Sequence, residues 1–380
     1  MSNQFGVVPL KETVAVWEVG ESGMRGIMLE VAAGKRLRVT GRWRRRRGER
    51  LPGDFLRIPN LRSMPLVLSF HPATAYAAVL PFKKTFAAGS AKAHRLEFQA
   101  MIREILDRTN LELRALAARR LKVEDLDAVL LDARVMHLTA DGIPVIHHLP
   151  DLSKKELRGM LHVVFTARPV FHDLHDLLHS GKELFVTERN KAAMAFLEHG
   201  SLEHKTSIRL LDLAPGAEIY TVFAPKEELP LKVAEFPWQG SVDRLLMREW
   251  GVSESAARTI LDGAVENGAS SRMADFLNRL TAESAETFEK ALYKFRIGGE
   301  VHVRRTARLP FALPRTLGKA ALAEFPFAEN FKALGFEMAG ANAPDPDLAD
   351  LLLPFLEYYY HRGDPLSHRA LTRQIHWIKQ

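Results

Sequence analysis

The sequence predicts an α/β protein of two similar halves, with an α+β segment inserted into the first half. Three short strands separated by glycine-bearing turns are expected between residues 13 and 43, and a second group of three strands begins at Ile208. Between the two groups, residues 160–200 alternate strand, helix, strand and helix. Such alternation is typical of α/β folds, and the repeated strand group indicates that the halves share one layout.

The first strand group consists of three short segments separated by glycine-bearing turns. These segments run over Val14–Val19, Arg25–Val31 and Lys35–Arg42. An Arg- and Pro-rich segment follows, after which strands are expected at Leu66–Ser69 and Tyr76–Pro81. Because the composition changes there, we place a domain boundary near residue 65.

A long amphipathic helix is expected over residues 93–119. Apolar side chains recur there at the spacing of one helical face, at Phe98, Met101, Ile102, Ile105 and Leu106. Two strands follow, at Ala128–Leu138 and Ile143–His148, and Asp141-Gly142 supplies the residues of a hairpin turn. The helix is therefore expected to lie on a small sheet.

The second half continues with further strands and with three helices. Strands are expected at 208–213, 217–224 and 231–238, helices at Ser241–Trp250, Ser253–Asn267 and Ser271–Phe295, a strand near 300–310, and a final helix at Leu348–Tyr360. These elements divide the chain into four parts. They are a first lobe of residues 1–65, 151–203 and 340–362, an inserted α+β subdomain of 66–150, a second lobe of 204–339, and a linker with an amphipathic helix over 363–380.

The composition is that of a folded protein without disulfides. Hydrophobic residues make up 47% of the 380 residues and charged residues 26%, which excludes a disordered chain. The absence of cysteine excludes disulfides and thiolate metal sites. We find no signal peptide and no apolar stretch long enough to span a bilayer, so a cytoplasmic protein with at most peripheral membrane contact is expected. A net charge of +7 favours anionic partners.

The order of these elements resembles the actin superfamily, in particular the bacterial division protein FtsA and the pilus-assembly protein PilM. Three segments carry the resemblance, namely DLDAVLLDARVMHLTADGIPV, FPWQGSVDRLLMREWGVSESAARTI and PDPDLADLLLPFLEYYYHRGD. The resemblance implies an actin-like bilobed fold. It also implies two hairpin turns that hold the phosphates of a nucleotide, with glycines for close backbone approach and acidic residues for Mg²⁺.

The first implied phosphate turn keeps part of the pattern of the superfamily. Gly20 and Ser22 match that pattern, and Glu18 and Gly23 complete the candidate nucleotide-binding residues of this turn. Glu18 retains the carboxylate but is one methylene longer than the expected Asp. Glu21 adds a negative charge next to a position meant for polyphosphate.

The second implied phosphate turn is more degenerate, because only Asp212 and Gly216 match. Pro215 removes an N–H donor, and alanines replace a glycine and a hydroxyl residue at 214 and 217. Where the superfamily has a Gly-Gly pair for adenosine, this chain has Arg304-Arg305-Thr306, whose side chains are expected to obstruct an adenine. The candidate residues of the two turns are therefore interpreted as vestigial nucleotide-binding residues, namely Glu18, Gly20, Ser22, Gly23, Asp212 and Gly216. We expect no cofactor, with weak ATP and Mg²⁺ binding as the other interpretation.

Two polar clusters have both a functional and an ordinary interpretation. The run Arg42–Arg47 either grips phosphate groups, with Trp43 stacking, or is a solvated hairpin end, which we favour; no nucleic acid partner is expected. His172, His175 and His179 either hold a metal or form an exposed helix face above Leu174, Leu177 and Leu178. We favour the exposed face, expect no metal, and assign no catalytic residue.

The last residues predict a short basic amphipathic helix. Leu371, Ile375 and Ile378 share one face, Trp377 flanks it, and Arg369, Arg373 and Lys379 lie away from it. FtsA-like proteins end in a similar helix that docks on the inner membrane. The other interpretation is a terminal helix packed on its own domain.

The resemblance implies an adaptor rather than an enzyme. Such an adaptor tethers a tubulin-like division filament to the inner face of the cell membrane, contacts anionic lipid and self-associates into filaments. Two alternatives stay open: a pilus-assembly adaptor of the PilM type, and an active actin-like ATPase.

Overall fold

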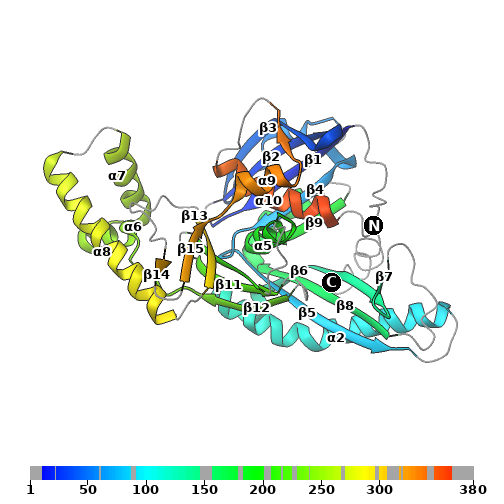
Figure 1. Cartoon of the computed structure of the whole chain (residues 1–380). Coiled ribbons are helices and arrows are strands. Elements are labelled where there is room, and N and C mark those ends of the chain that lie inside the picture. Colours follow the sequence, from blue (N-terminus) through cyan, green and yellow to red (C-terminus); the bar gives the residue numbers. More distant parts are fainter. Residues whose placement is uncertain are drawn as a thin grey trace. The chain divides into compact units, whose positions relative to one another are not determined.

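The computed structural model describes most of the chain, in ranges separated by short gaps (Figure 1). The described ranges are 11–21, 23–59, 61–86, 91–145, 156–178, 183–200, 207–214, 217–224, 229–238, 240–266, 270–295, 299–305, 316–317, 320–339 and 346–361. The chain divides into two compact units. Unit 1 comprises Met1–Glu203 with Phe327–Gln380, and unit 2 comprises His204–Pro326.

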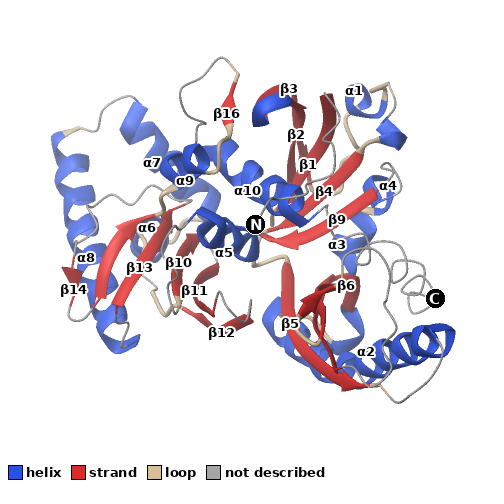
Figure 2. Cartoon of the chain, turned by 45° about the vertical axis from the view of Figure 1, so that its right-hand side comes forward, coloured by secondary structure: helices blue, strands red, loops and turns tan. Residues whose placement is uncertain are grey.

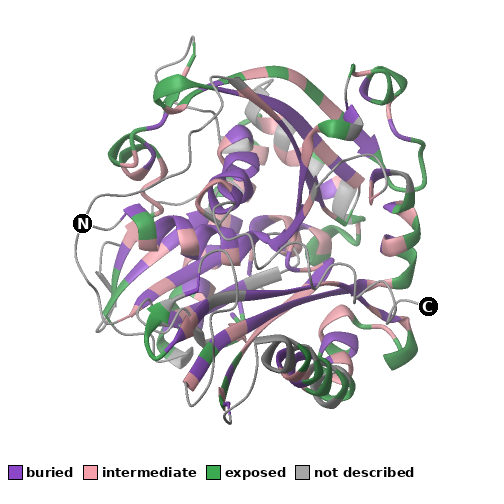
Figure 3. Ribbon diagram, turned by 90° about the vertical axis from the view of Figure 1, so that its right-hand side faces the viewer, coloured by how far each residue is buried: buried purple, intermediate pink, exposed green. Residues whose placement is uncertain are grey.

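Unit 1 is organised by a six-stranded sheet of order β16-β3-β2-β1-β4-β9. The strands β1 (Lys11–Val19), β2 (Gly23–Ala32) and β3 (Arg36–Arg46) form the predicted antiparallel meander. The strands β4 (Pro65–Phe70) and β9 (Glu183–Glu188) extend the sheet in parallel with β1, and β16 (Glu337–Met338) pairs with the start of β3. Residues of the central strands are buried along most of their length (Figure 3).

Helices pack against this sheet and against one another (Figure 2). The long helix α10 (Pro346–His361) contacts β1, β4, β9 and α5 (Arg189–Gly200). The helix α9 (Phe327–Ala333) packs on α5, where the rings of Phe196 and Phe327 stack at 5.1 Å. Shorter helical segments are η1 (Ala33–Lys35), α1 (Gly53–Leu56), η2 (Leu61–Ser63), α3 (Arg168–Asp173) and α4 (His175–Leu178).

Aromatic side chains fill the core beside β1. Trp17 is fully buried, lies parallel to the ring of Trp43 at 6.3 Å, and meets Phe55 edge to face at 4.9 Å. Gly26 is required by this packing, since a Cβ there would lie 2.5 Å from the Trp17 ring. Trp43 therefore packs within its own unit.

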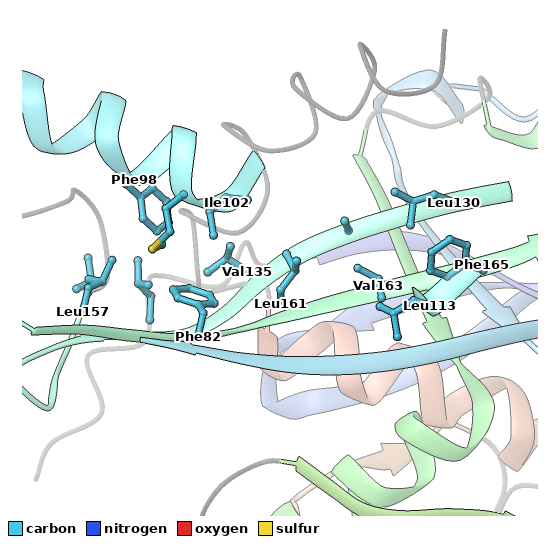
Figure 4. Close-up of a cluster of buried hydrophobic side chains, with 14 of the residues drawn as sticks. Phe82, Phe98, Ile102, Leu113, Leu130, Val135, Leu157, Leu161, Val163 and Phe165 are labelled. Atoms are coloured by element: carbon cyan, nitrogen blue, oxygen red, sulfur yellow. The ribbon is translucent and has the colours of Figure 1, made fainter. Parts of the chain in front are cut away.

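The inserted part of unit 1 is a four-stranded sheet of order β5-β8-β6-β7. It consists of β5 (Ala75–Thr85), β8 (Glu156–Ala167), β6 (Ala128–Ala140) and β7 (Ile143–Pro144), with η3 (Asp125–Asp127) leading into β6. The 31-residue helix α2 (Ala91–Leu121) contacts β5, β6 and β8. Phe98 and Ile102 extend from α2 toward Phe82, Val135 and Leu161 of the sheet, as expected from their spacing (Figure 4).

Unit 2 repeats the strand order of unit 1. Its sheet runs β12-β11-β10-β13-β15-β14, from the strands β10 (Ile208–Ala214), β11 (Ala217–Ala224), β12 (Leu229–Glu235), β13 (Gly299–Arg305), β14 (Thr316–Leu317) and β15 (Ala320–Glu324). In both units an antiparallel meander is followed by two strands parallel to its first strand. The predicted duplication of the layout is thereby confirmed.

Three helices lie in the described part of unit 2. They are α6 (Val242–Trp250), α7 (Glu254–Glu266) and α8 (Ser271–Phe295). Gly251 ends α6 at φ +63°, a left-handed conformation that glycine adopts at little cost. None of the helices within the described ranges is long and apolar enough to cross a membrane.

Four elements belong to other parts of the architecture than the sequence assigns to them. β4 pairs with β1 and β9, so it belongs to the first sheet and not to the insert of residues 66–150. β8 pairs along β5 and β6, so residues 156–167 belong to the insert. α9 and β16 lie in unit 1, although the sequence places them in the second lobe of residues 204–339. Each assignment depends on pairing between distant segments, which local composition does not encode.

Candidate functional site: two hairpin turns with paired acids

The turn between β1 and β2 is closed by its own backbone. The N–H of Gly20 donates to the carbonyl of Gly23 at 2.8 Å. A Cβ on Gly23 would lie 2.1 Å from the carbonyl oxygen of Arg45, so the close approach of β3 requires glycine at this position. Glu21 is exposed at the tip, and Ser22 lies outside the described residues. The packing of β3 thus explains the glycine at position 23 without any ligand.

Glu18 is buried and held by two arginines. Its side chain is 6% exposed, Arg25 Nε donates to its Oε2 at 2.5 Å, and Arg189 Nη1 lies 3.4 Å from its Oε1. Arg25 also donates to Asp350 Oδ2 at 2.9 Å, which connects the turn to α10. Burial by itself lowers the pKa of Arg25, but the charges of Glu18 and Asp350 outweigh it and raise that pKa above its ordinary value.

The ends of the neighbouring strands β4 and β9 carry further buried polar side chains, of which Thr187 connects to α10. Ser69 lies beside Glu18 in the register of β1 and β4, and Thr187 lies beside Ser69 in β9. Thr187 Oγ1 donates to Glu357 Oε2 at 2.5 Å, and Lys191 forms an ion pair with the same carboxylate. The sheet edge is therefore filled by a network of internal ion pairs and hydrogen bonds.

The second hairpin turn, between β10 and β11, has the same arrangement of charge. Asp212 is fully buried, and Arg304, which is 4% exposed, faces it from the neighbouring strand β13. Arg304 Nη1 lies 3.7 Å from Asp212 Oδ2. The backbones of Ala214 and Ala217 pair at the end of the hairpin, whereas Pro215, Gly216 and Thr306 lie outside the described residues. Arg304 is thus directed at Asp212, which corrects the expectation that it obstructs an adenine.

No known family model matches this sequence, and no curated protein matches it. Solved structures do match. A PilM–PilN type IV pilus biogenesis complex aligns with a TM-score of 0.51 and 12% identity, over 90% of this chain and 98% of that chain. A Bacteroides thetaiotaomicron protein of unknown function with an actin-like ATPase fold aligns at TM-score 0.40 and 8% identity, over 91% and 99% of the two chains. The chain has the actin-like fold of the PilM structure.

The predicted resemblance and fold class are confirmed by the match to the PilM structure. A third example, a ROK hexokinase from Thermus thermophilus, has a TM-score of 0.31 and 10% identity over 91% of this chain and 99% of that one. At such identities the likeness concerns the fold alone.

The acids of both turns face arginine side chains. A carboxylate that serves Mg²⁺ needs oxygen atoms directed to the ion or its waters, usually next to substrate phosphates. Here Glu18 is held by Arg25 and Arg189, and Asp212 has Arg304 3.7 Å away, each within its own unit. The acids of both turns therefore act as internal counterions of arginine.

The histidine segment does not form one helix. It is divided at Leu174 into α3 and α4, and His172 and His175 are exposed, while His179 lies outside the described residues. Leu174 and Leu177 are fully buried, as the ordinary interpretation expects. Among the residues that the structure describes, no group of three His, Asp or Glu side chains could hold a metal ion.

The arginine run of β3 divides into two faces of the strand. Arg45 is buried and donates to the carbonyls of Glu49 and Asp173, the latter at 2.8 Å, and Arg47 lies 3.5 Å from the Asp173 carboxylate. Trp43 Nε1 donates to Asp54 Oδ2 at 2.9 Å. These residues stabilise the end of the hairpin.

A cavity of about 270 Å³ lies on the opposite face of the strand and was missed by sequence reasoning. It is lined by Arg25, Gly26, Ile27, Arg42, Trp43, Arg44, Leu348 and Leu351. In the sequence, the alternation of arginines along β3 indicates one wall of this cavity. The contribution of α10 has no sequence signal, because it depends on tertiary packing.

The residues of the predicted membrane helix lie outside the described part of the chain. They are Arg369, Leu371, Arg373, Ile375, Trp377, Ile378 and Lys379. Their docking on a membrane stays a prediction from sequence.

Proposed function

We propose that this chain is a non-catalytic actin-like adaptor that binds a segment of a partner protein, as a pilus-assembly adaptor of the PilM type would. The observation that carries the proposal is the pairing of Glu18 with Arg25 and Arg189 and of Asp212 with Arg304. It argues against the active ATPase, since both acids already have internal cations. Without nucleotide hydrolysis, such a fold acts by binding other molecules at its surface.

The kind of partner is proposed from the fold match. The solved structure that aligns along 90% of this chain is a PilM–PilN complex, and this supports a pilus-assembly protein as partner. A tubulin-like division filament, which the sequence analysis put first, has no comparison in its favour, and neither has self-association into filaments. Pilus-assembly genes next to the gene of this chain would support the proposal, whereas a tubulin-like division gene there would favour the other partner.

Purified protein is expected to bind Mg²⁺-ATP no more tightly than high micromolar. Pro215 removes a phosphate donor from the second turn, and the acids of both turns have arginine partners. Isothermal titration calorimetry and a fluorescent ATP analogue measure the constant. Low-micromolar binding that is lost in Asp212→Asn would show that the turns hold nucleotide, and the non-catalytic proposal would then fail.

Residues 366–380 are proposed to dock reversibly on anionic membranes at the inner face of the cell membrane. Burial of Leu371, Ile375, Ile378 and part of Trp377 contributes roughly 25 cal/mol per Å² of apolar surface. Each basic residue near an anionic leaflet adds about 1 kcal/mol. A short helix is marginal in water, so its ordering offsets much of this gain and leaves a weak anchor.

Liposome co-sedimentation tests this anchor. Vesicles with acidic lipid are expected to pellet the protein at low salt, and Ile375→Glu or deletion after Gly363 is expected to leave it in the supernatant. Gln380→Glu makes the same charge change on the opposite face of the predicted helix and should retain binding. If the deletion variant pellets as well as the full chain, the helix is not the anchor.

A further inference from the structure

The cavity beside β3 combines an apolar floor with a cationic rim. Ile27 of β2 and Leu348 and Leu351 of α10 supply the apolar surface, and Arg42 and Arg44 of β3 are exposed at its side. Its volume of about 270 Å³ is below that of pockets for drug-sized ligands, which begin near ~300 Å³. The cavity therefore suits one side chain of a larger partner better than a whole nucleotide.

The strand that forms the rim lies at an edge of the sheet. Among the described residues, β16 pairs only with Arg36 and Leu37, so residues 39–45 of β3 have no strand on their outer side. An exposed strand edge of this length is a template for a further strand. Extended peptides bind proteins in this way, with affinity from backbone hydrogen bonds and specificity from pockets for alternate side chains.

The charge of the rim selects the partner. In the register of β2 and β3, Arg25 lies opposite Arg44 and Ile27 lies opposite Arg42, which places these four residues on one face. Among the described residues that line the cavity, three are arginines and none is acidic. Arg25 is already paired with Glu18 and Asp350, so the positive charge of the rim comes from Arg42 and Arg44. Because a guanidinium has five N–H donors, an arginine that already has one partner can still donate to a carboxylate.

We infer that an extended acidic segment of a partner protein adds to the edge of β3 at residues 39–45 and places an apolar side chain in this cavity. Side chains of an extended peptide alternate between two faces, so an apolar residue with an acidic residue two positions away on each side presents all three to the cavity face. The inference rests on the proposed adaptor function, since it specifies the chemistry of the partner segment. The chain's own C-terminal segment 366–380 is basic and does not fit this rim.

The probe for this site is a fluorescein-labelled peptide of sequence Thr-Asp-Thr-Leu-Thr-Asp-Thr. Its binding to the protein is measured by fluorescence anisotropy. We expect saturable binding that weakens at least tenfold in Arg44→Glu. Arg38→Glu is the matched control, because it makes the same charge change on the same strand at a residue that pairs with Glu30 outside the cavity. Both arginines are exposed, so neither change should disturb folding, and thermal unfolding of the variants checks this.

Two further measurements separate the parts of the inference. A peptide with lysine in place of aspartate, and one with serine in place of leucine, should each bind at least tenfold more weakly. Amide hydrogen exchange at residues 39–45 should slow when the acidic peptide is added, since strand addition protects backbone N–H groups. Absent binding, equal binding of the lysine peptide, equal loss in Arg38→Glu, or unchanged exchange at these amides overturns the inference. The peptide experiments test only this inference. The non-catalytic proposal is tested separately, by the titration with ATP.

Discussion

Replacement of Glu18 by glutamine is expected to lower the free energy of unfolding of unit 1 by about 3–5 kcal/mol, the usual cost of breaking a buried ion pair by removal of one partner. Arg189 is 3% exposed and faces Glu18 Oε1, so its charge would remain buried without this carboxylate. Arg25 keeps its contact with Asp350 at 2.9 Å and is expected to lose less. Urea unfolding followed by hydrogen exchange in β1 and β2 measures the change.

The matched control is Glu21→Gln in the same turn. Glu21 is exposed, so its neutralisation should change stability by no more than about 0.5 kcal/mol. The sign of the Glu18 effect separates the two roles of this carboxylate. A carboxylate that is conserved for binding Mg²⁺ rather than for stability lowers the free energy of unfolding when no ion is bound. Its neutralisation would then leave the free energy of unfolding unchanged or raise it. A gain in stability for Glu18→Gln would contradict its role as an arginine counterion.

Local patterns in the sequence were sufficient for most elements of the fold. Residues 271–295 form one helix with the predicted bounds, because polar and apolar residues alternate at helical spacing from end to end. The Asp141-Gly142 turn forms with φ values of +50° and +79°, which the dipeptide favours. Such features depend on neighbouring residues alone.

The site could be predicted only in part, because its partners come from distant strands. The turns were identified by Gly20, Gly23 and Asp212, but the sequence gives no sign that Arg304 faces Asp212 or that Arg189 reaches Glu18. The first pair requires β13 to lie beside β10, and the second requires α5 to follow β9 at the same sheet edge. The resemblance to the actin superfamily identified Arg304 as a substitution, and only the topology explains what it contacts.

Replacement of Asp212 by leucine is expected to lower the free energy of unfolding of unit 2 by about 3–5 kcal/mol, since it leaves Arg304 buried in a sheet without its carboxylate. The matched control is Glu289→Gln, an exposed acidic residue of α8 in the same unit. Its neutralisation should change stability by no more than about 0.5 kcal/mol. Hydrogen exchange in β10, β11 and β13 during urea unfolding reports on this unit by itself.

A double replacement decides whether the loss belongs to the pair. Because buried ion pairs can be replaced by apolar residues of similar volume at little cost, Arg304→Met in the Asp212→Leu background should restore much of the lost stability. The coupling between the two positions should then exceed about 1 kcal/mol, as it does for residues in direct contact. If the two changes add without coupling, Asp212 and Arg304 do not stabilise each other, and the carboxylate of the second turn is available to a ligand after all.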